Sequence, residues 1–336
     1  MRVLVTGGTG YIGSHVCVEL IESGHEVLIL DNLVNSKQDV LGRIEKICGV
    51  LPEFINSDIK DASVLERIFR DHSIDAVSHF AGLKSVSESL IKPLDYYDNN
   101  IIGTLNILQK MNKFGVSKFI FSSSATVYGM PKNLPIRENF SVCPLNPYAQ
   151  SKLYIEEFLK SISESNPNFY YSSLRYFNPV GAHKSGLIGE DPITNLDNIM
   201  PTLLNVAIGK EKVFPIFGGD FDTHDGTGIR DYIHVVDLAK GHVAALDYLS
   251  SDKSTNTTIN LGIGHGVSVL ELVKKMELVS GKTIDTKFMP RRSGDLPICY
   301  SDPSLALELF NWKADYDLSD MCLDSWNWTL KNKKSA

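Results

Sequence analysis

A glycine-rich turn between two apolar runs is the feature of this 336-residue sequence that most restricts its fold. Residues 2–6 (RVLVT) form a short β-branched run, which is typical of a buried parallel strand. The glycine loop 7–13 follows, then a helical pattern over 14–23, and then a second apolar run, 26–30, that ends at Asp31. Strand, glycine loop, helix, strand and acid in this order predict a dinucleotide-binding βαβ unit.

Each part of this unit meets a separate physical need. Glycines let the backbone turn tightly and approach a pyrophosphate, whose negative charge the following helix N-terminus attracts. Asp31 would accept hydrogen bonds from the adenine ribose hydroxyls and repel a 2′-phosphate. The sequence therefore favours NAD over NADP, the alternative being a tight βα turn that binds no cofactor.

The same alternation continues downstream and predicts the fold class. Expected strands lie at 53–56, 76–80 and 118–121, with helical patterns at 62–71 and 94–114. Repeated βαβ units predict an α/β fold with a doubly wound parallel Rossmann sheet, whose ligands sit at the carboxyl ends of the strands. We expect an NAD-binding domain over 1–178, with a returning segment near 230–260. A smaller C-terminal α/β domain over 179–336 would bind the substrate.

A tyrosine and a lysine four positions apart suggest acid–base chemistry. Tyr148 and Lys152 would lie one turn apart on one face of a helix over 148–163. A nearby ammonium favours the phenolate, which would bring a pKa near ~10 closer to neutrality. Taken alone, such a pair is more often a surface tyrosine and lysine on an amphipathic helix.

Composition excludes several classes of function. A hydrophobic content of 43%, a charged content of 22% and a net charge of −7 are typical of a globular protein and leave no basic stripe for nucleic acid. Five scattered cysteines without a CxxC predict reduced thiols and a cytoplasmic location. We also expect no membrane span and no metal site, because no long apolar run and no histidine spacing suggests one.

Several motifs together resemble the extended short-chain dehydrogenase/reductase family, and within it the 4-epimerases of UDP-hexoses. They are residues 6–13, 79–84, 121–129, 148–152, 174–182, 225–234 and 290–297. The resemblance implies that NAD stays bound while hydride leaves the sugar C4 and returns to its other face, which interconverts UDP-glucose and UDP-galactose. It implies that Tyr148 moves the proton of the 4-hydroxyl, Ser124 hydrogen-bonds the same oxygen, and Lys152 lowers the Tyr148 pKa.

The resemblance also implies which residues surround the cofactor and the UDP-sugar. The expected cofactor-binding residues are Gly7, Gly10, Tyr11, Ile12, Gly13, Asp31, Asn32, Asn35, Ser36, Asp58, Ile59, Phe80, Ala81, Gly82, Lys84, Asn99, Ser122, Tyr148, Lys152 and Tyr176. The expected substrate-binding residues are Lys84, Ser124, Tyr148, Asn178, Asn198, Arg230, Arg292, Asp295 and Cys299. Arginines suit this role because a guanidinium can donate two hydrogen bonds to one phosphate.

Two features of the sequence distinguish between related enzyme activities. Related 4,6-dehydratases carry an Asp-Glu pair after the serine, whereas Ala125-Thr126 here cannot do that proton work. Cys299 replaces a tyrosine of glucose-restricted epimerases, so we hypothesise that UDP-GlcNAc and UDP-GalNAc are also substrates. The alternative is that Cys299 is only a small buried apolar residue.

The sequence leaves two alternative functions open and suggests an oligomeric state. The rivals are a sugar-nucleotide dehydratase or reductase of the same fold, and a non-catalytic NAD-sensing regulator on this scaffold. The resemblance also suggests a homodimer joined through the helices 94–114 and 148–163.

Overall fold

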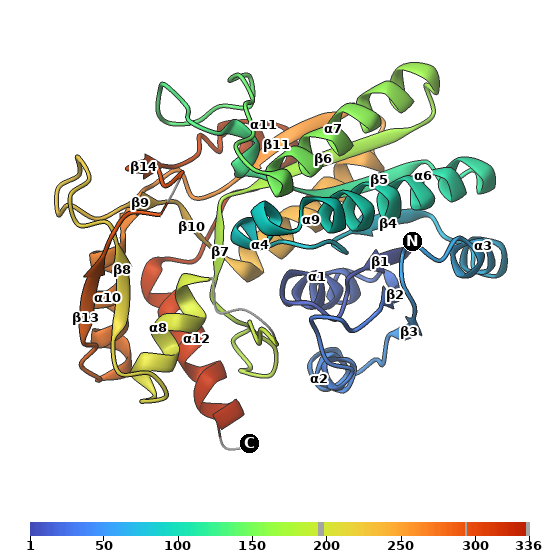
Figure 1. Cartoon of the computed structure of the whole chain (residues 1–336). Helices are drawn as coiled ribbons and strands as arrows, with labels where there is room; N and C mark the ends of the chain where they lie inside the picture. The colour runs from blue at the N-terminus through green and yellow to red at the C-terminus, as the bar shows by residue number, and fades with distance from the viewer. Residues whose placement is uncertain (194–197, 293, 334–336) are drawn as a thin grey trace.

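The computed structural model describes residues 1–193, 198–292 and 294–333, so Ser293 of the 290–297 motif lies outside it. A parallel sheet with the strand order β11-β6-β5-β4-β1-β2-β3 forms the centre of the molecule (Figure 1). Its strands are β1 (Arg2–Thr6), β2 (Glu26–Asp31), β3 (Glu53–Asn56), β4 (Ala76–His79), β5 (Lys118–Ser124), β6 (Tyr170–Tyr176) and β11 (Thr257–Leu261). This arrangement confirms the predicted doubly wound parallel sheet.

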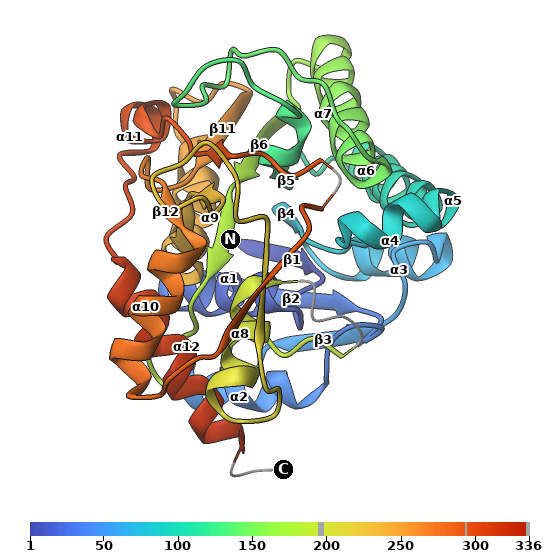
Figure 2. The ribbon, with the colours of Figure 1, turned by 60° about the vertical axis from the view of Figure 1, so that its left-hand side comes forward.

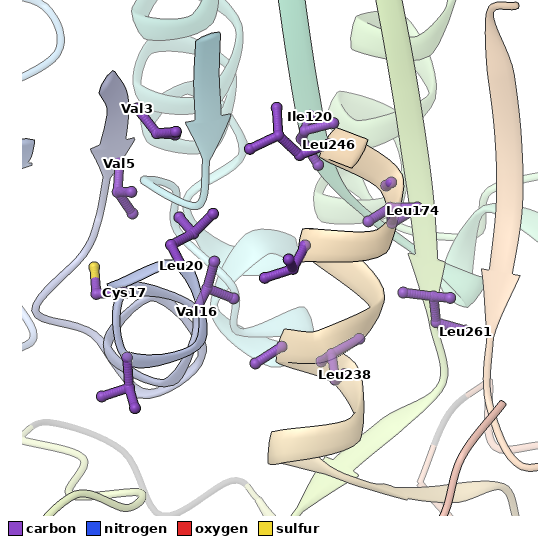
Figure 3. Packing of buried hydrophobic residues seen from close by; sticks show 14 of the residues in the cluster. Val3, Val5, Val16, Cys17, Leu20, Ile120, Leu174, Leu238, Leu246 and Leu261 are labelled. Atoms are coloured by element: carbon purple, nitrogen blue, oxygen red, sulfur yellow. The ribbon is translucent and has the colours of Figure 1, made fainter. Parts of the chain in front are cut away.

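Helices cover both faces of the sheet. One face carries α1 (Tyr11–Glu22), α2 (Asp39–Cys48) and α9 (Val235–Leu249), and the other α3 (Ala62–Asp71), α6 (Gly103–Phe114) and α7 (Pro147–Ser165). Successive side chains of β1 point to opposite faces of the sheet and contribute to the apolar core on each. Val3 and Val5 pack under α1 and α9, while Leu4 packs on the opposite face. Figure 3 shows Val3 and Val5 above Leu20 of α1, and Leu246 of α9 beside Ile120. Each such buried side chain contributes roughly 1.5–3 kcal/mol of transfer free energy.

The order of the strands reverses between β1 and β4. The chain first runs outward through β2 and β3, then returns to place β4 on the other side of β1. Gly7 follows β1 with a φ of +71°, and a Cβ built there would lie 2.7 Å from the Ala81 nitrogen. The carboxyl ends of β1 and β4 therefore meet at the point where open α/β sheets bind their ligands.

The helix expected over 94–114 consists of three consecutive segments. They are α5 (Pro93–Tyr96), the π-helical turn η1 (Tyr97–Ile102) and α6, and they follow the short helix α4 (Val86–Ile91). The first helix also differs from expectation, because α1 begins at Tyr11 instead of Ser14. The Ser14 amide donates to the Gly10 carbonyl at 2.9 Å, which places the end of the glycine loop inside the first helical turn.

The second half of the chain forms a smaller α/β layer beside the carboxyl edge of the sheet, on the left in Figure 1. Its elements are β7 (Asn178–Val180), α8 (Ile199–Ala207), β8 (Phe214–Phe217), β9 (Ile229–Arg230), β10 (Tyr232–His234), β12 (Val267–Ser268), α10 (Val269–Ser280), β13 (Thr286–Met289), β14 (Ile298–Cys299) and α12 (Leu318–Lys333). The helix α11 (Ser304–Phe310) instead packs with α9 and β11 in the core of the main sheet. Short sheets pair β7 with β10, β8 with β13, and β9 with both β12 and β14. A separate core between α8, α10 and α12 stabilises this layer.

Candidate active site

One cavity of about 1500 Å³ opens at the carboxyl edge of the sheet and extends under the second-half layer. It exceeds the roughly 300–1,000 Å³ of an ordinary small-molecule site, so it has room for more than one nucleotide-sized ligand. All but one of the residues that the sequence assigns to cofactor or substrate line it. The exception is Asp58, whose carboxylate accepts from Asn32 Nδ2 at 3.0 Å and from the Lys60 amide at 2.8 Å.

The glycine loop brings backbone against backbone at the floor of the cavity. A Cβ on Gly13 would lie 2.2 Å from the Gly7 carbonyl oxygen, so only glycine allows the first turn of α1 to sit on the loop. The N-terminus of α1 faces the cavity through Tyr11 and Ile12. Free amides and the helix dipole together make this an anion-binding position.

Asp31, at the end of β2, is fixed by hydrogen bonds from three groups. Its Oδ2 accepts from the Thr9 amide at 3.1 Å, and its Oδ1 accepts from the Leu33 amide at 2.9 Å and from Ser36 Oγ at 3.2 Å. The carboxylate is thus held immobile at the rim of the cavity. This geometry suits a side chain that accepts hydrogen bonds from a ribose.

Ser124, Tyr148 and Lys152 come from two elements that meet in the middle of the cavity. Ser124 ends β5, while Tyr148 lies in the first turn of α7, which Pro147 starts and the Asn146 side chain caps. Lys152 lies one turn further along, buried, and its Nζ donates to the Ser122 carbonyl at 2.7 Å. The same Nζ lies 5.8 Å from the centroid of the Tyr148 ring.

The electrostatics of this group differ from the sequence-based expectation. Burial raises the pKa of Tyr148, and the Ser124 hydroxyl lowers it by a smaller amount. Burial also lowers the pKa of Lys152 to about 8, against the charge of Glu156, which raises it. The surroundings of Tyr148 in the chain itself therefore favour the neutral phenol, because desolvation penalises the phenolate.

Tyr176 and Phe80 line the same cavity as this group. The Tyr176 hydroxyl lies 2.7 Å from His242 Nε2, and the Phe80 ring lies 4.6 Å from the His242 ring, centroid to centroid. His242 is buried on α9, and burial lowers its pKa to about 3. A neutral imidazole thus fixes the orientation of both aromatic side chains.

The opposite side of the cavity carries cations paired with acids. Arg292 donates to Asp295 through Nε at 2.9 Å and Nη2 at 3.2 Å, and Arg230 Nη2 lies 3.6 Å from the same carboxylate. Arg230 also donates through Nη1 to the Leu296 carbonyl at 2.8 Å. Cys299 is half-buried here on β14, directly paired with Arg230 of β9.

Sequence reasoning missed three residues of this cavity. Glu190 accepts from Lys84 Nζ at 3.2 Å and from the Asn198 side chain, although no pattern around it suggests a site. Phe217 lies under Arg292, with the guanidinium carbon 5.0 Å from the ring centroid. Thr126 is hydrogen-bonded to Ser124, and its place two residues after that serine was the only available signal.

The described residues contain no group of three or more His, Cys, Asp or Glu side chains that could hold a metal ion. Within the same part of the chain, no helix combines the length and the apolar character needed to cross a bilayer.

Comparison with known proteins agrees with this geometry. A family model described as the NAD dependent epimerase/dehydratase family matches residues 3–262. A UDP-glucose 4-epimerase of Haemophilus influenzae is 52% identical over 335 residues, which cover 99% of each chain. A crystal structure of UDP-glucose-4-epimerase from Stenotrophomonas maltophila, with bound NAD and formylated UDP-arabinopyranose, covers 100% of both chains with a TM-score of 0.98 and 47% identity.

A second crystal structure is similar over the same length. UDP-glucose 4-epimerase from Bifidobacterium longum, in complex with NAD+ and UDP, has a TM-score of 0.96 and 48% identity and covers 100% of both chains. The chain therefore belongs to the NAD dependent epimerase/dehydratase family, alongside relatives that are UDP-glucose 4-epimerases.

Proposed function

We propose that the chain is an NAD-dependent UDP-glucose 4-epimerase, which interconverts UDP-glucose and UDP-galactose. The observation that carries the proposal is the meeting of Ser124, Tyr148 and Lys152 in one cavity with a dinucleotide loop on one side and paired arginines on the other. The full-length similarity to UDP-glucose 4-epimerases supports the same activity.

The chain's own residues fit NAD. A Cβ on Gly7 would lie against the backbone of Phe80 and Ala81, and one on Gly13 against the Gly7 carbonyl, so both glycines let the loop pack closely at the N-terminus of α1, which lines the cavity. Asp31 would hold the adenine ribose, Lys152 the nicotinamide ribose, and Phe80 and Tyr176 would position the ring. Bound there, NAD would supply the acceptor and donor of the hydride at the sugar C4.

The protein moves the proton that accompanies this exchange. Tyr148 accepts the proton of the sugar 4-hydroxyl and later returns it, while Ser124 donates a hydrogen bond to the same oxygen. Lys152 places a positive charge behind Tyr148 and so favours its ionised form. The UDP portion is bound by Arg230, Arg292 and Asn198. The hexose can therefore rotate while the UDP stays in place.

Incubation with UDP-galactose tests the proposal directly. We expect UDP-glucose to form, with no build-up of free NADH and no 4-keto-6-deoxy sugar. A 4-keto-6-deoxy product would indicate a dehydratase, and free NADH a reductase. Absence of turnover by both the parent and Tyr148→Phe would support an NAD-sensing regulator.

Dehydration is disfavoured by the structure of the turn after β5. Ala125 and Thr126 begin the 3₁₀ turn η2 (Ala125–Tyr128), and neither side chain carries an ionisable group. Removal of water from a sugar needs an acid and a base at this place. Inversion of one sugar hydroxyl needs no such pair, and its proton transfer needs only Tyr148 with Ser124 and Lys152.

We further propose that the hexose site accepts N-acetylhexosamines. Cys299 lines the cavity beside its strand partner Arg230, and a thiol occupies far less volume than a phenol. The space beside C2 of the sugar would then admit an acetamido group. UDP-GlcNAc and UDP-GalNAc would be interconverted by the same proton transfers.

Cys299→Tyr should separate the two substrate pairs. We expect epimerisation of UDP-GalNAc to fall by roughly 10- to 100-fold in kcat/KM, because overpacking at the sugar wall costs about 1–3 kcal/mol. Turnover of UDP-galactose should change by less than about threefold. Side-by-side assays on both sugars, with Cys143→Tyr as the exposed-cysteine control, make the measurement. Intact N-acetyl activity in Cys299→Tyr would exclude the idea.

We propose the division of the chain that the sequence suggests, with NAD on 1–178 and a segment near 230–260, and the UDP-sugar on 179–336. The support is that β11 extends the main sheet beside β6, and that α9 packs on α1. We also propose a cytoplasmic location, which agrees with five unpaired cysteines.

A homodimer is supported by an apolar surface on the helices before and beside η1. Leu90, Ile91 and Leu94 are 58%, 79% and 77% exposed, and Tyr154 of α7 is 40% exposed. Figure 2 shows α4, α5, α6 and α7 together on one side of the molecule, away from α10 and α12. We propose that a second copy covers this surface.

Leu94→Glu should weaken that dimer by at least about tenfold in Kd, because an unpaired charge would be buried in the interface. Analytical ultracentrifugation over a dilution series gives the mass. Leu278→Glu is the matched control, since Leu278 is 79% exposed on α10, far from the proposed interface. Equal effects of the two substitutions, or none, would contradict the proposed surface.

A further inference from the structure

The hydroxyl oxygen of Ser124 receives two hydrogen bonds from a single neighbour. The Thr126 amide donates to Ser124 Oγ at 3.2 Å, and the Thr126 hydroxyl donates to the same oxygen at 2.9 Å. Both bonds arise because Ser124 is the N-cap of the turn η2, which brings Thr126 back over it. Thr126 itself lines the cavity, and its carbonyl is engaged by the Gly129 amide at 3.2 Å.

Two accepted hydrogen bonds determine what Ser124 can still do. A serine hydroxyl has two lone pairs and one proton. With both lone pairs occupied by Thr126, the oxygen cannot accept from a phenol, and its proton is free to donate. Tyr148 lines the same cavity, and the Ser124 side chain lowers the pKa of Tyr148 against the larger effect of burial.

We propose that Thr126 is a positioning residue that fixes the Ser124 hydroxyl as a donor toward the Tyr148 oxygen and the reacting sugar hydroxyl. The inference rests on the proposed epimerase function. A donor stabilises the phenolate, whereas a serine free to rotate would also accept from the neutral phenol and stabilise it. Thr126 therefore biases Tyr148 toward the form that removes a proton.

Other ionisable groups around Tyr148 are the same in every variant compared. Lys152 lies beside it on α7, and Tyr176, at the end of β6, lines the same cavity. The acids of the neighbouring α4 and η1 are paired elsewhere, Glu88 with Lys92 and Asp98 with Lys60. A substitution at Thr126 therefore tests the direction of the Ser124 hydrogen bond without changing these groups.

Thr126→Val and Thr126→Ser form the test pair in the full-length enzyme with NAD bound. Valine keeps the branched shape and the backbone amide but removes the hydroxyl donor, and serine retains the donor. For Thr126→Val we expect kcat on UDP-galactose to fall roughly 3- to 10-fold, and its pH profile to move upward by about 0.5–1 pH unit. KM should change less than about twofold, and Thr126→Ser should resemble the parent.

A second readout does not depend on turnover. The ultraviolet titration of the Tyr148 phenolate, taken as the difference between each protein and its Tyr148→Phe counterpart, should move to higher pH in Thr126→Val only. An unchanged profile and titration in Thr126→Val would overturn the proposal, as would a Thr126→Ser variant as impaired as Thr126→Val. If the parent does not epimerise UDP-galactose, the proposed function fails, while the titration still decides whether Thr126 controls Tyr148.

Discussion

Tyr148→Phe is expected to lower kcat for UDP-galactose epimerisation by roughly 10²–10⁴-fold, the range that a positioned general acid–base contributes. Phenylalanine keeps the ring that packs in the first turn of α7 but removes the side-chain hydroxyl that carries the proton. Because the phenol is not needed to bind the UDP portion, KM should stay within about threefold. Steady-state kinetics at saturating UDP-galactose make the measurement.

Tyr154→Phe is the matched control for this substitution. Tyr154 lies on the same helix but is 40% exposed, so loss of its hydroxyl should leave kcat unchanged. Thermal unfolding of all three proteins shows whether the fold is retained. If Tyr148→Phe keeps more than about a tenth of the parent kcat, another residue moves the proton and the assignment of Tyr148 is wrong.

Arg175→Met should have the largest effect on stability, lowering the free energy of unfolding by about 3–5 kcal/mol. Arg175, on β6, binds Glu156 of α7 through two hydrogen bonds, Nη2 to Oε2 at 2.6 Å and Nε to Oε1 at 3.0 Å. Both side chains are only 7% exposed. Removal of the guanidinium leaves a buried carboxylate without its counter-ion, which is more costly than loss of the pair itself.

The pair also anchors groups near the active site. Arg175 Nη1 donates to the Tyr128 hydroxyl at 2.9 Å, and the Tyr128 hydroxyl donates to Asn260 Oδ1 at 2.7 Å. This network joins α7, which carries Tyr148, to β6 and β11. Part of the loss in Arg175→Met should therefore appear as lower kcat at temperatures where the variant is still folded.

Chemical denaturation measures the stability change, and Arg137→Met is its control. Arg137 pairs with Asp302 at 2.9 Å, but its side chain is 63% exposed. An exposed ion pair contributes about 0–1 kcal/mol, so this variant should differ little from the parent. Addition of Glu156→Gln to Arg175→Met should recover part of the loss, because the unpaired charge is then gone. Similar losses in Arg175→Met and Arg137→Met would contradict the explanation.

Local sequence patterns were sufficient to predict the parallel sheet and its first ligand-binding turn. Gly7, Gly13 and Asp31 all lie within the first βαβ unit, whose strand, turn and helix follow from residues close together in the sequence. The spacing of Tyr148 and Lys152 was equally readable, because helical geometry fixes which side chains share a face. β6 was missed, since its sequence YYSSLRY is rich in polar residues that only a central position in the sheet buries.

The boundaries of elements were less predictable than their existence. The elements α8 and β8 were not predicted, because their apolar residues pack against α10 and α12 from later in the chain. The place of Asp58 at the adenine stays a prediction, and its carboxylate accepts hydrogen bonds from Asn32 and Lys60. The packing of α8 and β8 cannot be read from residues that are close in sequence.

The sequence by itself determined the dinucleotide loop, the strand–helix alternation and the tyrosine–lysine pair, because each depends on contacts within a few residues. Only the tertiary structure decided that Ser124, Tyr148, Arg230 and Cys299 share one cavity, and that Glu190 joins them. It also decided the surroundings of Tyr148, where desolvation outweighs the nearby donor. Strand order and burial are set by long-range packing, and so are the pKa values of the groups that packing encloses.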